Sequence, residues 1–69
     1  MNRTPVSSSN IASIGYDLTT QTLEAEFHNG NIYQYFDVPQ HIYDGLLTAS
    51  SKGQYLNQNI KLVYRYAKV

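Results

Sequence analysis

The side chains that could act in catalysis or bind a metal are few and lie far apart in the sequence. They comprise two histidines and five carboxylates: His28, His41, Asp17, Glu24, Glu26, Asp37 and Asp44. A zinc site normally takes three or four convergent N, S or O ligands, and no motif brings a second ligand near either histidine. Glu24 and Glu26 would share an open face of a strand, where carboxylates keep their ordinary pKa and do not act as acid–base catalysts. We therefore expect no enzyme activity, no catalytic residue, no metal and no cofactor.

A segment near the end of the chain has the composition of a nucleic-acid-binding surface. Bases and tyrosines interleave between Lys61 and Lys68, and such segments bind phosphates through cations and bases through stacked rings. The candidate contacts are Lys52, Lys61, Tyr64, Arg65, Tyr66 and Lys68. An edge strand protected from aggregation by Lys and Arg would have the same composition. Both interpretations stand at this point.

A second candidate surface follows from a predicted hairpin. Asn29-Gly30 is the dipeptide preferred by a two-residue type I′ turn, and that turn would place Glu26 opposite Tyr33 and Glu24 opposite Tyr35. The more apolar face of this hairpin would hold Leu23, Ala25, Phe27, Ile32, Gln34 and Phe36. Tyr33, Tyr35, Glu24 and Glu26 would then share the wetter face. We expect that face to suit a protein partner or a second copy, since its glutamates would repel RNA.

A third, weaker candidate is the predicted helix start at Ser51-Lys52-Gly53. Backbone amides and the Lys52 charge could hold a small anion or nucleotide there, although an ordinary helix cap has the same residues.

The elements that position these residues form an α+β domain. Alternating apolar residues predict a small antiparallel three-stranded sheet over about 11–18, 22–28 and 31–36, with a bulge where Ile11 falls out of phase. Helical spacing predicts helices over about 38–49, capped by Asp37, and 51–61. An extended C-terminal segment follows. Gly45 weakens the first helix by about 1 kcal/mol, which close packing against the sheet would explain. We expect residues 1–5 to be a flexible tail and 6–69 a single domain.

Composition narrows the class of protein. The chain has 69 residues, no cysteine and no net charge, so we expect one cytoplasmic domain without disulfides. No apolar run approaches the ~20 residues of a membrane span. The first 49 residues carry a net charge of −4 and the last 20 carry +4. This division indicates either a basic binding face or two halves that neutralise each other, with Glu24 and Glu26 paired to Lys61 or Arg65.

An ordered set of motifs spans nearly the whole chain. They are Val6-x-Ser-Ser-x-Ile11, Ile14-Gly-Tyr-Asp17, Leu23-x-x-x-Phe27-x-x-Gly30, Tyr33-x-Tyr35, Val38-Pro39, Ser51-Lys-Gly53 and Ile60…Tyr64-x-Tyr66. Together they resemble the KTSC domain over about residues 6–69. That family is named for a segment at the C-terminus of some lysyl-tRNA synthetases and also occurs as stand-alone bacterial proteins. The resemblance implies no catalytic or metal residue, and the synthetase fusion suggests RNA binding.

These observations predict a non-catalytic binding module, with RNA as the leading partner. The first alternative is a protein-interaction or self-association module that uses the open tyrosine face. The second is a module that binds a small anion or nucleotide at the Ser51 helix start.

Overall fold

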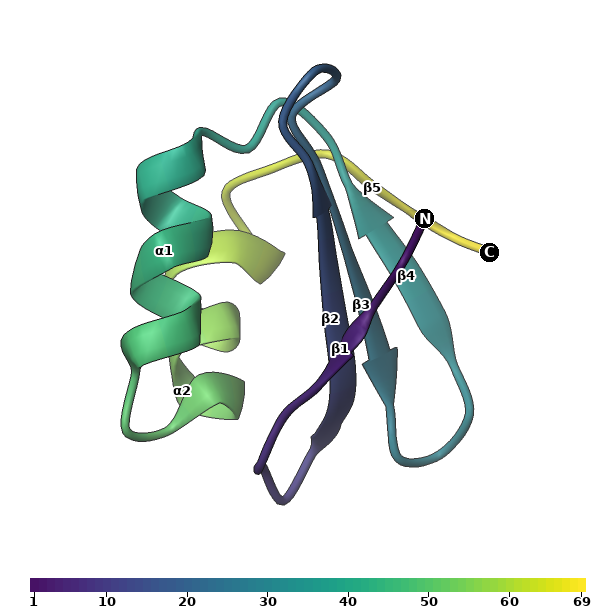
Figure 1. Cartoon of the computed structure of the whole chain (residues 1–69), viewed down its shortest axis with the longest axis vertical. Coiled ribbons are helices and arrows are strands. Elements are labelled where there is room, and N and C mark those ends of the chain that lie inside the picture. Colours follow the sequence, from purple (N-terminus) through teal and green to yellow (C-terminus); the bar gives the residue numbers. More distant parts are fainter.

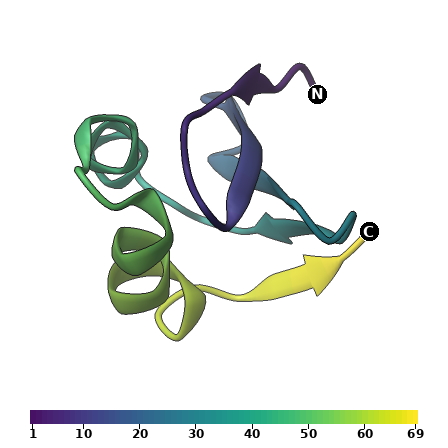
Figure 2. The same ribbon diagram turned by 90° about the horizontal axis from the view of Figure 1, so that it is seen from below.

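The strands pair antiparallel in the order in which the chain makes them. The computed structural model describes residues 1–69, and its sheet has the order β1-β2-β3-β4-β5 (Figure 1). The strands are β1 (Thr4–Pro5), β2 (Ile11–Asp17), β3 (Thr22–Phe27), β4 (Ile32–Tyr35) and β5 (Tyr66–Lys68). Between β4 and β5 lie α1 (Gln40–Thr48), α2 (Lys52–Leu56) and the π-helical turn η1 (Asn57–Lys61). The helices α1, α2 and η1 cover one face of the sheet (Figure 2). The first and last strands form the two opposite edges of the sheet.

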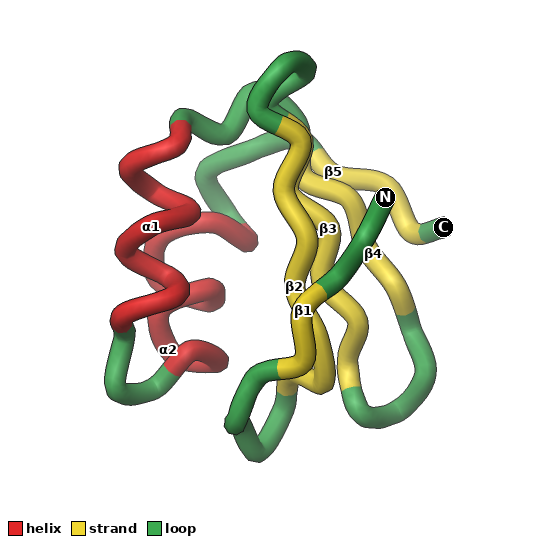
Figure 3. Tube along the Cα trace, viewed as in Figure 1, coloured by secondary structure: helices red, strands yellow, loops and turns green.

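The predicted α+β class is confirmed, but the sheet has five strands instead of three. The two further strands lie at the chain ends (Figure 3). β1 pairs Thr4 with Ile14 within the segment that we expected to be a flexible tail. Pro5 is compatible with this position because an edge strand tolerates a missing N–H. β5 forms within the predicted extended segment and pairs with β4.

The hairpin between β3 and β4 has a different turn from the one predicted. The Gly30 amide donates to the Phe27 carbonyl (2.9 Å) and the Phe27 amide donates to the Asn31 carbonyl (2.9 Å). Within this loop only Gly30 has a positive φ, at 92°. These are the features of a three-residue loop, a type I turn followed by a G1 bulge. The predicted type I′ turn, which needs two positive φ angles, is therefore wrong.

The extra loop residue shifts the strand register by one position. The observed pairs are Leu23 with Tyr35, Ala25 with Tyr33, and Glu24 with Gln34. A shift of one residue moves every side chain of a strand to the other face. The prediction that Tyr33 and Tyr35 share a face with Glu24 and Glu26 is therefore wrong. The tyrosines lie on the side that faces the helices, and the glutamates lie on the opposite side.

The core lies between this face of the sheet and the helices. Its buried members are Ile11, Ile14, Leu23, Ala25, Tyr35, Val38, Leu46, Leu56 and Ile60. The predicted irregularity at Ile11 is confirmed, since the β2–β3 register shifts between Ile11 and Ser13. Tyr16 stacks on Tyr43 of α1 with a centroid separation of 4.6 Å, which joins that helix to the sheet.

The helices differ from prediction at their ends and in their packing. α1 begins at Gln40, and its N-cap is Pro39 without a side-chain hydrogen bond. Asp37 has a φ of 58° and does not cap the helix as predicted. Gly45 packs closely, but its neighbour is α2 and not the sheet. A Cβ atom at Gly45 would lie 2.9 Å from Cζ of Tyr55.

Candidate functional site

An aromatic groove of about 230 Å³ runs between the β4–β5 side of the sheet and the end of the helical layer. Its wall is made of rings: Phe27, Tyr33, Tyr35 and Tyr66. Its other side includes Lys61 and Asn57 of η1. The rings come together because they share the helix-facing side of three neighbouring strands. The helices stop short of β5, so that Tyr66 keeps 57% of its surface exposed.

The rings contact one another edge to face or at a tilt. The Tyr33 and Tyr66 centroids lie 6.0 Å apart, and those of Phe27 and Tyr33 lie 5.8 Å apart, both in T-shaped geometry. Tyr35 and Tyr66, which are paired residues of β4 and β5, lie 5.9 Å apart. Such pairs stabilise one another by about 0.5–1.5 kcal/mol beyond burial. The exposed ring of Tyr66 is therefore held in place by two inner rings.

Tyr35 is the floor of the aromatic groove. Only 3% of its surface is exposed. Burial, followed by the neighbouring Tyr33 and Tyr66, raises the pKa of Tyr35 to about 12. Its hydroxyl therefore stays protonated and neutral at physiological pH, so the groove acquires no negative charge from it.

The charge around the groove is positive. Lys61 is the charged residue that lines it, and no carboxylate does. Lys68 is paired with Tyr33 across β4 and β5, which places it on the same side of the sheet. Neither lysine forms an ion pair. Both cations are therefore free to bind an anion next to the rings.

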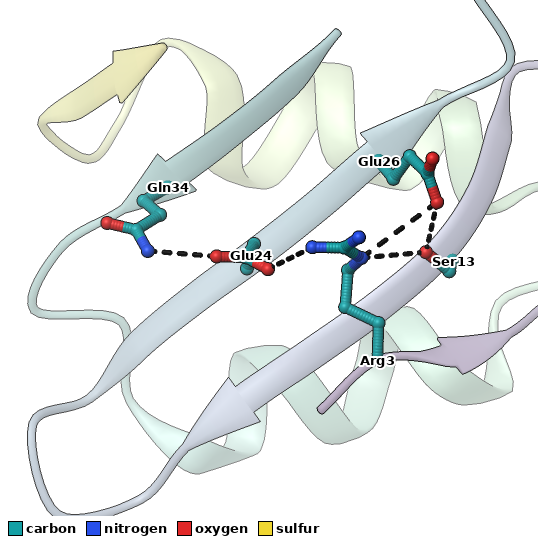
Figure 4. Close-up of polar contacts among 5 residues, drawn as sticks. All are labelled: Arg3, Ser13, Glu24, Glu26 and Gln34. Atoms are coloured by element: carbon teal, nitrogen blue, oxygen red, sulfur yellow. Dashed lines mark hydrogen bonds and ion pairs between the residues drawn. The ribbon is translucent and has the colours of Figure 1, made fainter. Parts of the chain in front are cut away.

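The two glutamates form their polar contacts on the other face of the sheet. Arg3 forms an ion pair with Glu24, and its Nε lies 3.9 Å from Oε1 of Glu26 (Figure 4). Arg3 Nε also donates to Ser13 Oγ (3.1 Å), whose hydroxyl donates to Glu26 (2.9 Å). Gln34 donates to Glu24 (2.9 Å). This network, which we call the Arg3 cluster, pairs the glutamates with Arg3, not with Lys61 or Arg65.

Known proteins are similar to this chain over nearly its whole length. The family model of the KTSC domain matches residues 7–66. The chain belongs to the KTSC family. A crystal structure of a KTSC domain protein from Yersinia pestis is 40% identical, has a TM-score of 0.93, and is covered to 96% by 99% of this chain. The fold that carries the aromatic groove is thus the same as that of a solved KTSC domain structure of similar length.

Two kinds of relative share this KTSC sequence. An uncharacterized protein from Stutzerimonas stutzeri (strain A1501) is 41% identical over 100% of this chain and 99% of its own length. A lysine–tRNA ligase from Nostoc sp. (strain PCC 7120 / SAG 25.82 / UTEX 2576) is 44% identical over 86% of this chain. The chain spans only 10% of that ligase, so the match concerns one segment of a much longer protein.

The KTSC fold brings together only part of the basic segment that the sequence singled out. Lys61, Tyr66 and Lys68 meet at or beside the groove. Arg65 instead pairs with Asp37 (2.8 Å) and lies 5.6 Å from the centroid of Phe36.

Two further candidates of that segment lie elsewhere. Tyr64 packs against the core. Lys52 donates to the Ala49 carbonyl at 3.2 Å and is not among the groove-lining residues.

The predicted anion site at the start of α2 has few free groups that could bind an anion. The helix has five residues, and the Ser51 hydroxyl accepts from the Gln54 amide at 3.4 Å. Gly53 is buried, and its Cα faces the Asn10 side chain. These contacts are those of an ordinary helix cap.

The structure has neither a cluster of metal-ligating side chains nor a helix that could span a membrane. No group of three or more His, Cys, Asp or Glu residues could hold a metal ion. No helix has the length and apolar character that crossing a membrane requires.

Sequence reasoning missed Phe27 and Asn57 as parts of the groove. Phe27 was expected on the apolar face of the hairpin, and Asn57 fell within the predicted helix over 51–61 without being singled out. A signal was available in the apolar face of the predicted hairpin, which included Gln34. A polar side chain in a predicted core indicates that the register is wrong by one residue.

Proposed function

We propose that this KTSC domain is a non-catalytic module that binds single-stranded RNA in the aromatic groove. The observation that carries the proposal is the set of three tyrosine rings beside Lys61, with no carboxylate among them. Single-strand binding sites in general combine stacking rings with cations that bind the backbone. The presence of a related segment in a lysine–tRNA ligase, a protein whose substrate is RNA, supports the same partner.

The objection raised by the glutamates no longer applies to this groove. Glu24 and Glu26 belong to the opposite face and are paired with Arg3. In the proposed complex, Tyr66 offers an exposed ring to a base, while Lys61 and Lys68 bind phosphates on either side. The groove volume of about 230 Å³ suits one or two bases, so we expect modest affinity and little sequence preference.

The test is fluorescence anisotropy of a labelled single-stranded RNA octamer at low salt. Tyr66→Ala should weaken binding by about 5- to 150-fold, since stacking contributes about 1–3 kcal/mol per base. Tyr66→Phe keeps the ring and should bind nearly as well as the wild type. Lys52→Ala is a matched control because it removes a lysine outside the groove. If wild-type protein at high micromolar concentration leaves the anisotropy unchanged, the proposal is wrong.

A further inference from the structure

The two edges of the sheet differ in their capacity to pair with another strand. β1 offers two residues, one of which is Pro5. β5 offers Tyr66, Ala67 and Lys68 with no proline. Short strands and prolines protect an edge from pairing, so β5 is the less protected of the two.

The hydrogen-bond pattern identifies the free backbone groups of β5. The Phe36 amide donates to the Arg65 carbonyl (2.9 Å), and the Val69 amide donates to the Ile32 carbonyl (2.8 Å). In an antiparallel pair, hydrogen-bonded positions alternate with positions whose N–H and C=O point away from the partner strand. The N–H and C=O groups of residues 65, 67 and 69 therefore point toward β4. The N–H and C=O groups of Tyr66 and Lys68 point outward from the sheet.

Most of the exposed large apolar side chains of the chain lie in β5 or in the residues just before and after it. Leu62, Val63, Tyr66 and Val69 have 88%, 63%, 57% and 62% of their surfaces exposed. Leu62 and Val63 lie in the turn that leads from η1 toward β5. Exposed apolar residues gathered beside an open strand edge are typical of a protein contact surface.

We propose that this edge binds the β5 edge of a second copy of the chain, antiparallel and centred on Ala67. In that register Tyr66 lies opposite the partner's Lys68, and Lys68 lies opposite the partner's Tyr66. Each outward N–H then meets an outward C=O, which gives four backbone hydrogen bonds across a twofold axis. The free backbone groups of β5 in one copy are thus complementary to those of β5 in the other copy.

The side chains favour this partner over an unrelated strand. The two residues that meet are a cation and an exposed aromatic ring, which attract one another. Lys68 does not face the partner's Lys68 directly, because the twofold axis passes beside Ala67. A generic strand would face Lys68 without a matching ring, which is how lysine protects an edge.

The twofold pairing would join the two sheets into one. Paired residues of neighbouring strands point to the same face, so both helical layers would lie on one side. The aromatic grooves of the two copies would then be adjacent along one continuous surface, with Leu62 and Val63 of each copy near the joint.

The first test is sedimentation equilibrium without RNA, from 10 µM to about 1 mM protein. Wild type should show a monomer–dimer equilibrium in this range. Lys68→Pro removes an outward N–H without removing a hydrogen bond to β4, and should raise the dissociation constant at least about tenfold. Lys68→Ala keeps the N–H and is the matched control, so the difference between the two variants reports the backbone bond. A strictly monomeric wild type would overturn the proposal.

The second test follows amide hydrogen exchange by NMR as the protein concentration rises. The Tyr66 and Lys68 amides should become protected, while the Ala67 amide should be protected at every concentration. Concentration-independent exchange at Tyr66 and Lys68 would contradict the pairing, as would protection that appears only when an acidic extended peptide is added. Neither test involves RNA, so failure here leaves the RNA proposal standing, and the reverse also holds.

Discussion

At the scale of single residues, Glu24 shows how the structure holds a buried charge. Its side chain is 8% exposed and is bound by Arg3 from one side and by Gln34 from the other. The Gln34 hydrogen bond, with Arg3 acting in the same direction, lowers the pKa of Glu24 against the opposing effect of burial. The carboxylate is therefore stabilised as an anion by Gln34 of β4 and by Arg3, which directly precedes β1.

Removing Arg3 should leave Glu24 without its cation. We expect Arg3→Ala to lower the free energy of unfolding by about 1–2 kcal/mol, toward the lower end of what losing a charged hydrogen bond costs because solvent still reaches Arg3. Arg65→Ala is the matched control: its ion pair with Asp37 is 76% and 73% exposed and should contribute less than about 1 kcal/mol. Urea unfolding at pH 7 compares the two. Equal losses would show that the Arg3 cluster stabilises the fold no more than an exposed ion pair does.

The lowered pKa of Glu24 also predicts how stability depends on pH. The unfolded chain binds a proton at this site near pH 4.5 and the folded chain at a lower pH. Its contribution to stability is therefore present above pH 4.5 and is lost as the pH falls through the folded pKa. Glu24→Gln should flatten the dependence of the unfolding free energy on pH below about pH 5. A curve as steep as that of the wild type would assign the effect to other carboxylates.

The raised pKa of Tyr35 predicts how the stability of the fold depends on pH in alkali. Its pKa of about 12 in the folded state lies above the ordinary value of 10.0. The folded state thus holds the phenol proton more tightly, so this contribution to stability is lost as the pH rises from about 10 to 12. Tyr35→Phe cannot ionise and should unfold less readily in alkali, relative to its stability at pH 8, than the wild type does. In an alkaline titration followed by absorbance at 295 nm, this variant should also lack the tyrosine ionisation step with the highest pKa.

The candidate site could be predicted from the sequence only in part. Lys61, Tyr66 and Lys68 were identified by their alternation, which is a local property. Tyr33 and Tyr35 were identified as contact residues but were assigned to the wrong face. Which residues a tyrosine faces depends on strand pairing, and pairing depends on one residue of loop length that Asn29-Gly30 leaves open.

At the scale of elements, the residue pattern predicted the elements that are long enough to show periodicity. β2, β3 and α1 each repeat an apolar position several times, and β4 is indicated by the turn residues Asn29-Gly30 that precede it. β1 and β5 have two and three residues, too few for a strand alternation. Such strands form because a neighbouring strand pairs with them, a tertiary effect that single-sequence patterns do not contain.

The contact between α1 and α2 gives a prediction whose sign separates two effects. Helix propensity alone favours Gly45→Ala by about 1 kcal/mol. A Cβ atom there would lie 2.9 Å from Cζ of Tyr55, whose hydroxyl donates to the Ile42 carbonyl at 3.0 Å. We expect Gly45→Ala to destabilise by about 1–3 kcal/mol because the helices must separate. In the Tyr55→Ala background the same change should be neutral or stabilising. Thermal unfolding of the four proteins measures the coupling, and additive effects would exclude the clash.

At the scale of the whole molecule, charges of opposite sign lie on opposite faces of one sheet. The glutamates are bound to Arg3 on one face, and Lys61 and Lys68 remain unpaired on the other. The net charge of zero is therefore compatible with two unpaired lysines beside the aromatic groove. Of the two explanations for the charge division, mutual neutralisation applies to Asp37 with Arg65 but not to Glu24 and Glu26.

This arrangement predicts a shallow salt dependence of RNA binding. Two phosphate contacts on a single strand give a slope of about −1.4 for the logarithm of the binding constant against that of salt concentration. Lys61→Ala should halve the slope, and Lys52→Ala should leave it unchanged. Anisotropy titrations at four salt concentrations measure it. A steep slope, or one insensitive to Lys61, would place the phosphate contacts elsewhere.

The strand order has a consequence for how the molecule folds and opens. The first four strands pair with neighbours joined by short loops, whereas β5 pairs with β4 only after both helices have been made. Closing that longer segment costs more chain entropy, so β5 should dock last in folding and detach first in local opening. Because β5 carries Tyr66, detachment dismantles the groove while the rest of the sheet stays folded. In the proposed RNA complex, this local opening would release the bound strand without unfolding the domain.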